Sequence, residues 1–197
     1  MVTKGEKTRE MIVHEAALLF NIKGYDGTSM NDLIDATGIK KGGIYRHFAG
    51  KEEIVLEAFD YAIRIRNQEM RDAMSRAENA VDGLLQVART FLGLVTNPVI
   101  PGGCPILNTA IEADDKLPPL KERAQKAMDD VRWVMQYIVS NGIEQGELRP
   151  YTNGDVVATV VISLVEGALM MSKLYDDTVH LHRALDHIAA YAETLKG

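Results

Sequence analysis

Apolar residues recur at intervals of three and four along nearly the whole chain, and this spacing limits the fold more than any other property of the sequence. Val13, Ala16, Ala17 and Phe20 are one example, and such a stripe is typical of an amphipathic helix. The two-residue alternation that predicts strands is scarce. The sequence therefore predicts an all-α fold of about nine helices.

Glycine, proline and capping residues divide this pattern into separate helices. Gly24 is expected to stop the first helix and Gly38 the second, while Thr28 or Ser29 can cap the second. Lys51 opens a long fourth helix. The helices are expected at about residues 4–23, 29–37, 40–47, 51–76, 79–96, 105–113, 118–142, 155–174 and 179–195.

Charge is distributed unevenly over a chain whose net charge is −6. Residues 1–50 hold seven basic and six acidic residues, whereas the remaining 147 hold 15 and 22. Within the first part, residues 35–51 are locally basic, which suits a negatively charged partner. We therefore expect two domains, at residues 1–51 and 52–197.

Several classes of protein are excluded by residues that the chain lacks. Cys104 is the only cysteine, so no disulfide forms within the chain and no multi-cysteine metal site exists. The histidines at 180, 182 and 187 do not share a helical face, and no recognisable nucleophile–base set occurs. We expect no metal, no cofactor and no enzymatic activity.

The first ten residues are polar and charged, which predicts that no secretory signal is present and that the protein is cytoplasmic. Residues 91–111 carry no charge, but Pro98, Pro101 and Pro105 interrupt them. A span of this kind reads as two buried helices joined by a turn, so no membrane segment is expected.

Two short predicted helices follow the first one and are joined by the turn Thr37-Gly38-Ile39, which predicts a helix-turn-helix. In the third helix, Ile44 and Phe48 lie four residues apart and are expected to face inward. The remaining side chains of that helix are then available to enter a DNA groove and to reach phosphates.

The run TSMNDLIDATGIKKGGIYRHFAGKEEIVLEAF resembles the DNA-binding domain of the TetR family of transcriptional regulators. This resemblance covers about residues 8–60 and implies a homodimer that binds a palindromic double-stranded operator, with release when a small molecule enters the C-terminal domain. Tyr45 and His47 match the phosphate-contacting residues of the family, and Lys41 and Lys51 match its two lysines. Lys40 and Gly43 depart from the family pattern. The predicted DNA-binding residues are Thr28, Ser29, Lys40, Lys41, Gly42, Gly43, Tyr45, Arg46, His47 and Lys51.

The later helices are expected to enclose a mostly apolar cavity for the effector, because methionines and aromatic residues are frequent there. Glu112 and Asn108 would supply polar groups. The predicted ligand-binding residues are Phe91, Leu94, Cys104, Ile106, Asn108, Glu112, Trp133 and Tyr137.

The helix at 155–174 is apolar on nearly all sides. A single monomer of this size can hardly cover that much apolar surface. We therefore expect a homodimer through residues 155–195.

Three alternatives stay open. Cys104 lies near a predicted helix N-terminus, so an electrophile-responsive or redox-responsive repressor is the nearest one. An enzyme on an all-α scaffold would show turnover, and an architectural DNA-binding protein would show no sequence preference.

Overall fold

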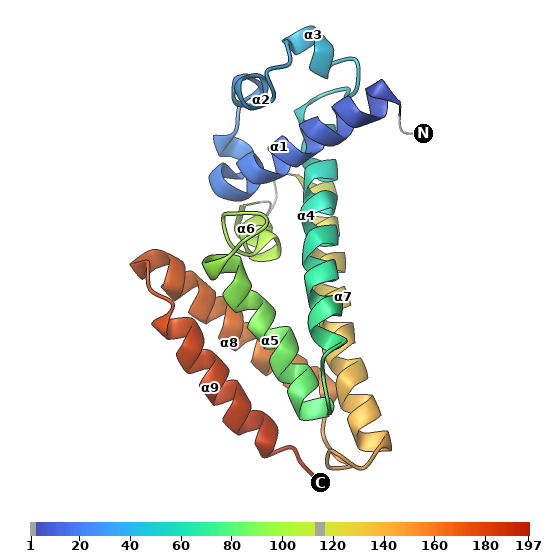
Figure 1. Cartoon of the computed structure of the whole chain (residues 1–197), viewed down its shortest axis with the longest axis vertical. Helices are drawn as coiled ribbons and strands as arrows, with labels where there is room; N and C mark the ends of the chain where they lie inside the picture. The colour runs from blue at the N-terminus through green and yellow to red at the C-terminus, as the bar shows by residue number, and fades with distance from the viewer. Residues whose placement is uncertain (1–2, 113–116) are drawn as a thin grey trace. The chain divides into compact units, whose positions relative to one another are not determined.

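The structure is a computed structural model that describes residues 3–112 and 117–197 (Figure 1). Within these ranges it contains nine helices and no strand apart from an isolated bridge between Leu148 and Lys196, so the all-α prediction is confirmed. The helices are α1 (Lys4–Gly27), α2 (Met30–Thr37), α3 (Lys41–Ile44), α4 (Lys51–Met74), α5 (Ala80–Thr96), α6 (Pro105–Glu112), α7 (Pro118–Glu144), α8 (Gly154–Tyr175) and α9 (Val179–Glu193).

Helix boundaries follow local sequence signals. Ser29, Asn79 and Asn153 cap α2, α5 and α8 through side chains that accept backbone N–H groups of the first turn. Gly24 was predicted to end the first helix; it breaks the helix with φ 78°, but α1 resumes after this kink and runs to Gly27. The predicted break at residues 114–119 lies partly outside the described residues, but α7 begins at Pro118 as expected.

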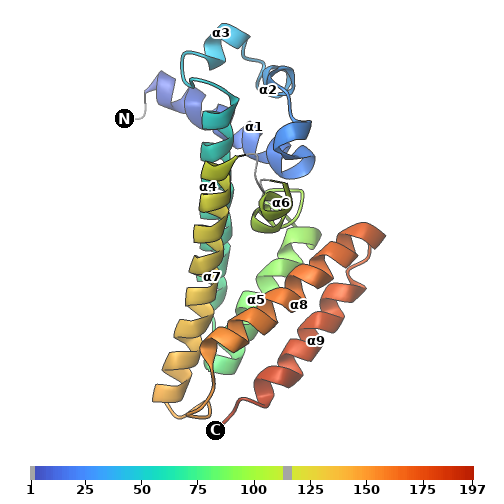
Figure 2. The same ribbon diagram turned by 180° about the vertical axis from the view of Figure 1, so that it is seen from behind.

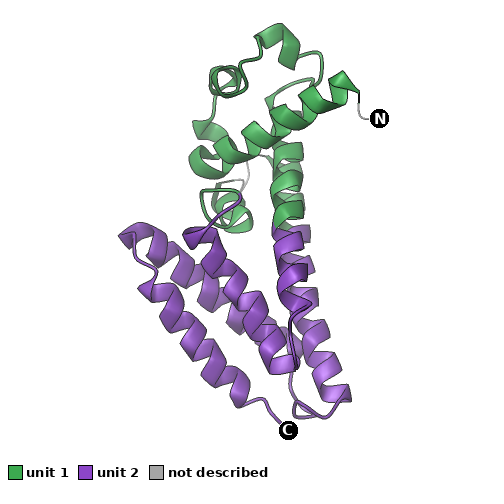
Figure 3. Ribbon diagram, in the orientation of Figure 1, with its two compact units in different colours: residues 1–65, 100–125 green, residues 66–99, 126–197 purple. Residues whose placement is uncertain are grey.

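The helices form two compact units, which Figure 3 distinguishes by colour. Unit 1 comprises residues 1–65 and 100–125, and unit 2 comprises residues 66–99 and 126–197. Within unit 1, α6 packs against α1 although almost eighty residues of chain separate them. In the structure, α6 packs with the N-terminal helices. The predicted domain boundary at residue 51 stays a prediction.

Unit 2 is built around α8, which packs against both α5 and α9 (Figures 1 and 2). Leu84, Phe91, Leu169, Leu181 and Ile188 are buried in its core. Of the described helices, α8 alone is long and apolar enough to cross a membrane by length and composition. Its packing on two neighbours accounts for that apolar character in the way a core helix does.

One face of α8 is not covered within the chain. Val156, Ser163, Gly167, Met170 and Leu174 are exposed and recur at intervals of three, four and seven. This face is apolar or small in character, whereas the opposite face is buried. The sequence predicted that this helix is buried on all sides. Within a single chain, this face of α8 stays exposed.

Candidate nucleic-acid interface

The entry to α2 is fixed by a reciprocal cap. The Ser29 hydroxyl accepts a hydrogen bond from the Asp32 N–H at 3.1 Å, and the Asp32 carboxylate accepts the Ser29 N–H at 2.7 Å. The ammonium of Lys23 and the donors of Ser29 hold the pKa of Asp32 well below its usual range. This end of α2 therefore carries a stabilised negative charge beside its N–H groups.

Gly38 supplies the turn between α2 and α3. Its φ of 66° is left-handed, and its N–H donates to the carbonyl of Ile34 at 2.9 Å. Leu33, Ile44 and Phe48 are buried on either side of this turn. The predicted helix-turn-helix and the inward positions of Ile44 and Phe48 are confirmed.

The third helix is shorter than predicted. It ends at Ile44 rather than near His47, and residues 45–47 continue as a turn. Gly42 and Gly43 weaken helix propensity at this point. Gly43 also approaches the core closely, because a Cβ there would lie 2.6 Å from Cγ2 of Ile39. That contact gives a packing reason for the glycine at which the chain departs from the family pattern.

The predicted DNA-binding residues differ in their access to solvent. Those exposed are Ser29, Lys40, Lys41, Gly42, Tyr45 and Arg46, and those half-buried are Gly43, His47 and Lys51. The Lys51 ammonium donates to the carbonyl of Tyr25 and lies 4.0 Å from the centre of its ring. Apart from Ser29 at the start of α2, the exposed residues lie within α3 or directly beside it in the chain, where a duplex would have access to them.

Thr28 is a correction to the sequence prediction. The residue is 0% exposed, and its hydroxyl donates to the carbonyl of Gly24 at 2.8 Å. Ser29 alone caps α2, so the two neighbouring hydroxyls have different roles. The structure does not support a DNA contact by the Thr28 side chain, because it closes the turn after Gly24 instead.

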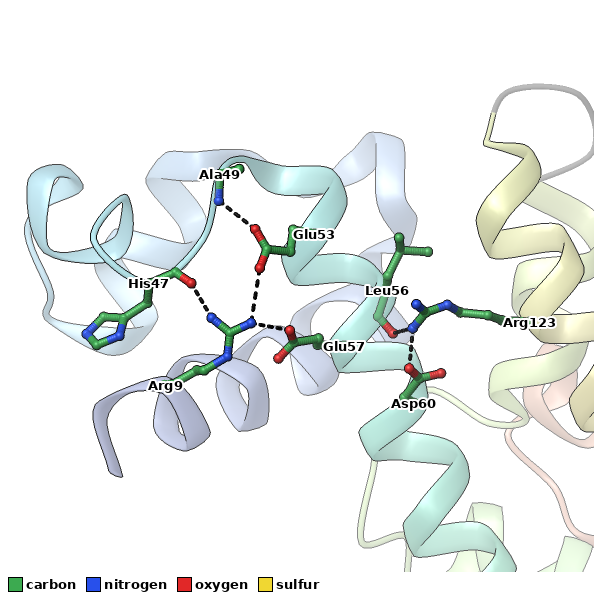
Figure 4. Close-up of polar contacts among 8 residues, drawn as sticks. All are labelled: Arg9, His47, Ala49, Glu53, Leu56, Glu57, Asp60 and Arg123. Carbon is green, nitrogen blue, oxygen red and sulfur yellow. Dashed lines mark hydrogen bonds and ion pairs between the residues drawn. The ribbon is translucent and has the colours of Figure 1, made fainter. Parts of the chain in front are cut away.

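Arg9 connects the segment after α3 to α1 and α4 (Figure 4). Its guanidinium donates to the carbonyl of His47 and to the carboxylates of Glu53, at 3.0 Å, and Glu57. The same guanidinium lies 4.2 Å from the centre of the Phe48 ring. Arg9 therefore fixes the backbone that follows the exposed residues of α3, a role that no local sequence signal indicated.

Glu53 completes this arrangement by accepting the Ala49 N–H at 2.6 Å (Figure 4). That backbone hydrogen bond and the Arg9 guanidinium lower the pKa of the Glu53 carboxyl. Further along α4, Arg123 from α7 donates to the carbonyl of Leu56, at 3.0 Å, and to Asp60. Helix α4 is thus held on two sides within unit 1.

The Glu112 side chain faces the backbone at the end of α1 rather than the effector cavity predicted from the sequence. Its two carboxylate oxygens accept the N–H groups of Tyr25 and Asp26, each at 2.8 Å. A Cβ on Gly24 would lie 2.5 Å from Oε2 of Glu112, so the close approach requires glycine. Helix α6 is thereby bonded to the backbone that leads from α1 into α2.

Asn108, one turn earlier in α6, makes a parallel set of contacts. Its side-chain amide donates to the carbonyl and side-chain oxygens of Asn21, at 3.1 Å each, and to the carbonyl of Gly102 at 3.0 Å. Asn108 and Glu112 line a cavity of about 40 Å³ together with Phe20. A space of this volume holds water rather than an organic effector, so these two residues position α6 against α1 within unit 1.

The other predicted ligand-binding residues are divided between the two units. Cys104 and Ile106 are buried in unit 1, and the Cys104 residue is 1% exposed. Phe91 is buried and Leu94 half-buried in unit 2. The burial of Cys104 differs from the accessible position that a reactive thiol requires.

Trp133 and Tyr137 are not enclosed within the chain. Their rings stack with centroids 5.4 Å apart, and Trp133 is 62% exposed. The inward stripe of α7 is formed by Val131, Met135 and Ile138, and the two aromatic residues lie four apart on another side of the helix. Their predicted place in an enclosed pocket is therefore not supported.

No group of three or more metal-ligating side chains occurs among residues 3–112 and 117–197. The known proteins to which this chain is similar are described as transcriptional regulators. The chain matches two family models: "Bacterial regulatory proteins, tetR family" over residues 12–58 and "Tetracyclin repressor-like, C-terminal domain" over residues 80–188.

Individual relatives agree with these models over nearly the whole chain. A TetR transcriptional regulator from Chloroflexus aurantiacus is 40% identical, covers 98% of both chains and has a TM-score of 0.94. The HTH-type transcriptional regulator LmrA of Bacillus subtilis is 27% identical over 169 residues, which are 84% of this chain and 86% of LmrA.

A more distant structure shares the fold. It is the TetR-family regulator CifR, as a cysteine mutant complexed with 26 bp operator DNA, and it is 19% identical with a TM-score of 0.83 over 92% of this chain and 94% of CifR. The helix-turn-helix geometry, the two family models and the relative at 40% identity agree with one another. The chain belongs to the TetR family and is a DNA-binding transcriptional regulator, not an enzyme.

Proposed function

We propose that this regulator is a cytoplasmic repressor that binds a palindromic operator as a homodimer and leaves it when a small molecule binds. The observation that carries the proposal is the exposed set around α3, which contains Lys40, Lys41, Tyr45 and Arg46, on a backbone fixed by Arg9. Repression, rather than activation, follows from the family resemblance.

Two kinds of DNA contact are assigned to this surface. Lys41, Tyr45, His47 and Lys51 contact phosphates, which position the protein on the duplex, and Ser29 lies near a phosphate. Base edges in the major groove are within reach of Lys40, Gly42 and Arg46. The operator complex of CifR supports this use of the fold.

Dimerisation is assigned to residues 155–195 on the evidence of the uncovered face of α8. Ser163 and Gly167 are small enough to allow close approach of a second α8, and Met170 and Leu174 supply apolar area. A dimer would present two copies of α3 to half-sites about one helical turn, roughly 34–36 Å, apart. Operator symmetry then mirrors the symmetry of the protein.

Effector binding is assigned to the apolar helices of the C-terminal half, with Phe91 and Leu94 as lining residues. An effector that prefers the non-binding conformation by about 2.7 kcal/mol lowers operator affinity about a hundredfold. This preference is within the ordinary range of coupling between two sites.

The salt dependence of operator binding tests the DNA-binding surface. Four phosphate contacts in each half-site predict that log K falls with log salt concentration at a slope of about −7. Lys41→Ala should weaken binding and make the slope shallower by about two in a dimer. Lys126→Ala, at an exposed position of α7, is the matched control. A slope near zero, or equal effects of the two substitutions, would refute the assignment.

A further inference from the structure

Arg66 is a charged side chain inside unit 2. It belongs to α4, and the residue is 5% exposed. Its Nη1 atom is buried and has no hydrogen-bond partner. The contact made by its guanidinium is with the ring of Phe91, whose centre lies 4.9 Å from Cζ. A ring face stabilises a cation but accepts no conventional hydrogen bond from it.

Among the described residues of the same unit, we find no carboxylate that forms an ion pair with the Arg66 guanidinium. Within the described residues, no ion pair shorter than 4.0 Å joins Arg66 to an acidic side chain. Glu69 is close enough for its charge to interact with Arg66, yet burial raises the pKa of the Glu69 carboxyl.

A buried guanidinium nitrogen without an acceptor is unfavourable, because it loses hydration and gains no hydrogen bond in return. Most buried polar groups in folded proteins are satisfied by protein or water. Exceptions concentrate at sites that bind something. Arginine is also the side chain best suited to bind an anionic oxygen group, because its N–H groups form a planar fork.

We propose that the Arg66 guanidinium binds the anionic oxygen group, a carboxylate or a sulfonate, of an otherwise apolar small molecule that enters unit 2. This inference rests on the proposed effector response and names the chemical class of effector. Phe91, one of the residues predicted to line the effector site, places an aromatic ring against the same guanidinium.

Two fluorescent probes of similar size test the inference. The anion 1-anilinonaphthalene-8-sulfonate carries a sulfonate, whereas neutral N-phenyl-1-naphthylamine does not. Each is titrated into the full-length wild type, Arg66→Met, Arg66→Lys and Arg71→Met, which is a matched control at an exposed position of the same helix and unit.

We expect Arg66→Met to weaken binding of the anionic probe at least about tenfold, since a hydrogen bond to a charged group is lost. Arg66→Lys should weaken it less, and Arg71→Met should leave it within about twofold. The neutral probe should bind all four proteins alike. Equal loss of both probes, or no loss of the anionic probe with Arg66→Met, would overturn the inference.

Thermal unfolding without any probe separates a ligand-binding arginine from a structural one. Arg66→Met should unfold at the same or a higher temperature than the wild type, because it removes an unsatisfied buried charge. A clear decrease in that temperature would instead assign Arg66 a structural role and overturn the inference. Operator binding by probe-free Arg66→Met should equal that of the wild type. Failure of the wild type to bind any operator would refute the proposed function, and failure of the probe comparison alone would refute only the role of Arg66.

Discussion

Substitution of Glu112 by Gln tests whether α6 holds the backbone that leads into the helix-turn-helix. The wild-type carboxylate accepts the N–H groups of Tyr25 and Asp26, each at 2.8 Å. Each N–H faces a different carboxylate oxygen, and glutamine replaces one of these two oxygens with an NH₂ group. Its amide N–H groups then face one of the two backbone N–H groups, and two donors repel each other.

The expected magnitude follows from these two hydrogen bonds. A hydrogen bond to a charged group contributes about 1.5–3 kcal/mol, and the lower part of that range applies because the Asp26 N–H is exposed. We expect Glu112→Gln to lower the free energy of unfolding by about 2 kcal/mol. If the same energy is lost from the DNA-binding conformation, operator affinity falls by at most about 30-fold.

Urea unfolding measures the first quantity and fluorescence anisotropy with a labelled operator measures the second. The control is Glu122→Gln, because Glu122 is an exposed residue of α7 in the same unit. If Glu112→Gln and Glu122→Gln agree within about 0.5 kcal/mol in both assays, which is the usual range for surface substitutions, the role given to Glu112 is refuted.

Three further predictions concern single positions. Gly24→Ala should destabilise the chain by about 2 kcal/mol or more, because φ is 78° there and a Cβ would lie 2.5 Å from Oε2 of Glu112. The control is Gly27→Ala, where a Cβ would make only ordinary contacts. Equal urea midpoints of the two variants would contradict the reasoning. Lys23 and Ser29 lower the pKa of Asp32 in the folded chain, so its stabilising effect is present above the ordinary aspartate pKa and is lost as pH falls through the lowered value. The stability difference between wild type and Asp32→Asn should therefore be full at pH 7 and shrink below about pH 4, and a difference that grows on acidification would refute this account. Ser163→Glu places a charge on the uncovered face of α8 and should yield monomers in sedimentation velocity, whereas Ser140→Glu on α7 should not; a wild-type monomer at micromolar concentration would disprove the proposed dimer.

Local signals in the sequence were sufficient for most of the fold. Helical periodicity, Gly24, Gly38 and the cap at Ser29 each act within a few residues, so a pattern read along the chain contains them. Two helix ends differ from the prediction: α1 continues past Gly24 to Gly27, and α3 ends at Ile44 rather than near His47, because Gly42 and Gly43 limit it. Thr28 and Ser29 are adjacent and both carry a hydroxyl, so the sequence alone could not distinguish the capping residue, Ser29, from the buried one, Thr28.

Contacts between distant residues could not be predicted in this way. Arg9 lies 38 residues from His47, and Glu112 lies 87 residues from Tyr25, so no spacing rule connects them. Glu112 was expected to face an effector because a carboxylate in an apolar segment suggested a ligand. For α7 the signal was present: Val131, Met135 and Ile138 form a helical stripe that excludes Trp133 from the buried side.

The central claim is that the exposed residues around α3 read a palindromic DNA sequence. Selection of bound duplexes from a random library by the purified protein tests it most directly, with Arg46→Ala, at an exposed position just after α3, selected in parallel. We predict that the wild type enriches an inverted repeat with half-site centres about 10 bp apart, or a multiple of one turn. Arg46→Ala should enrich the same repeat with relaxed preference at one or two positions of each half-site. Enrichment of no repeat by the wild type, or identical preferences of both proteins at every position, would contradict the claim.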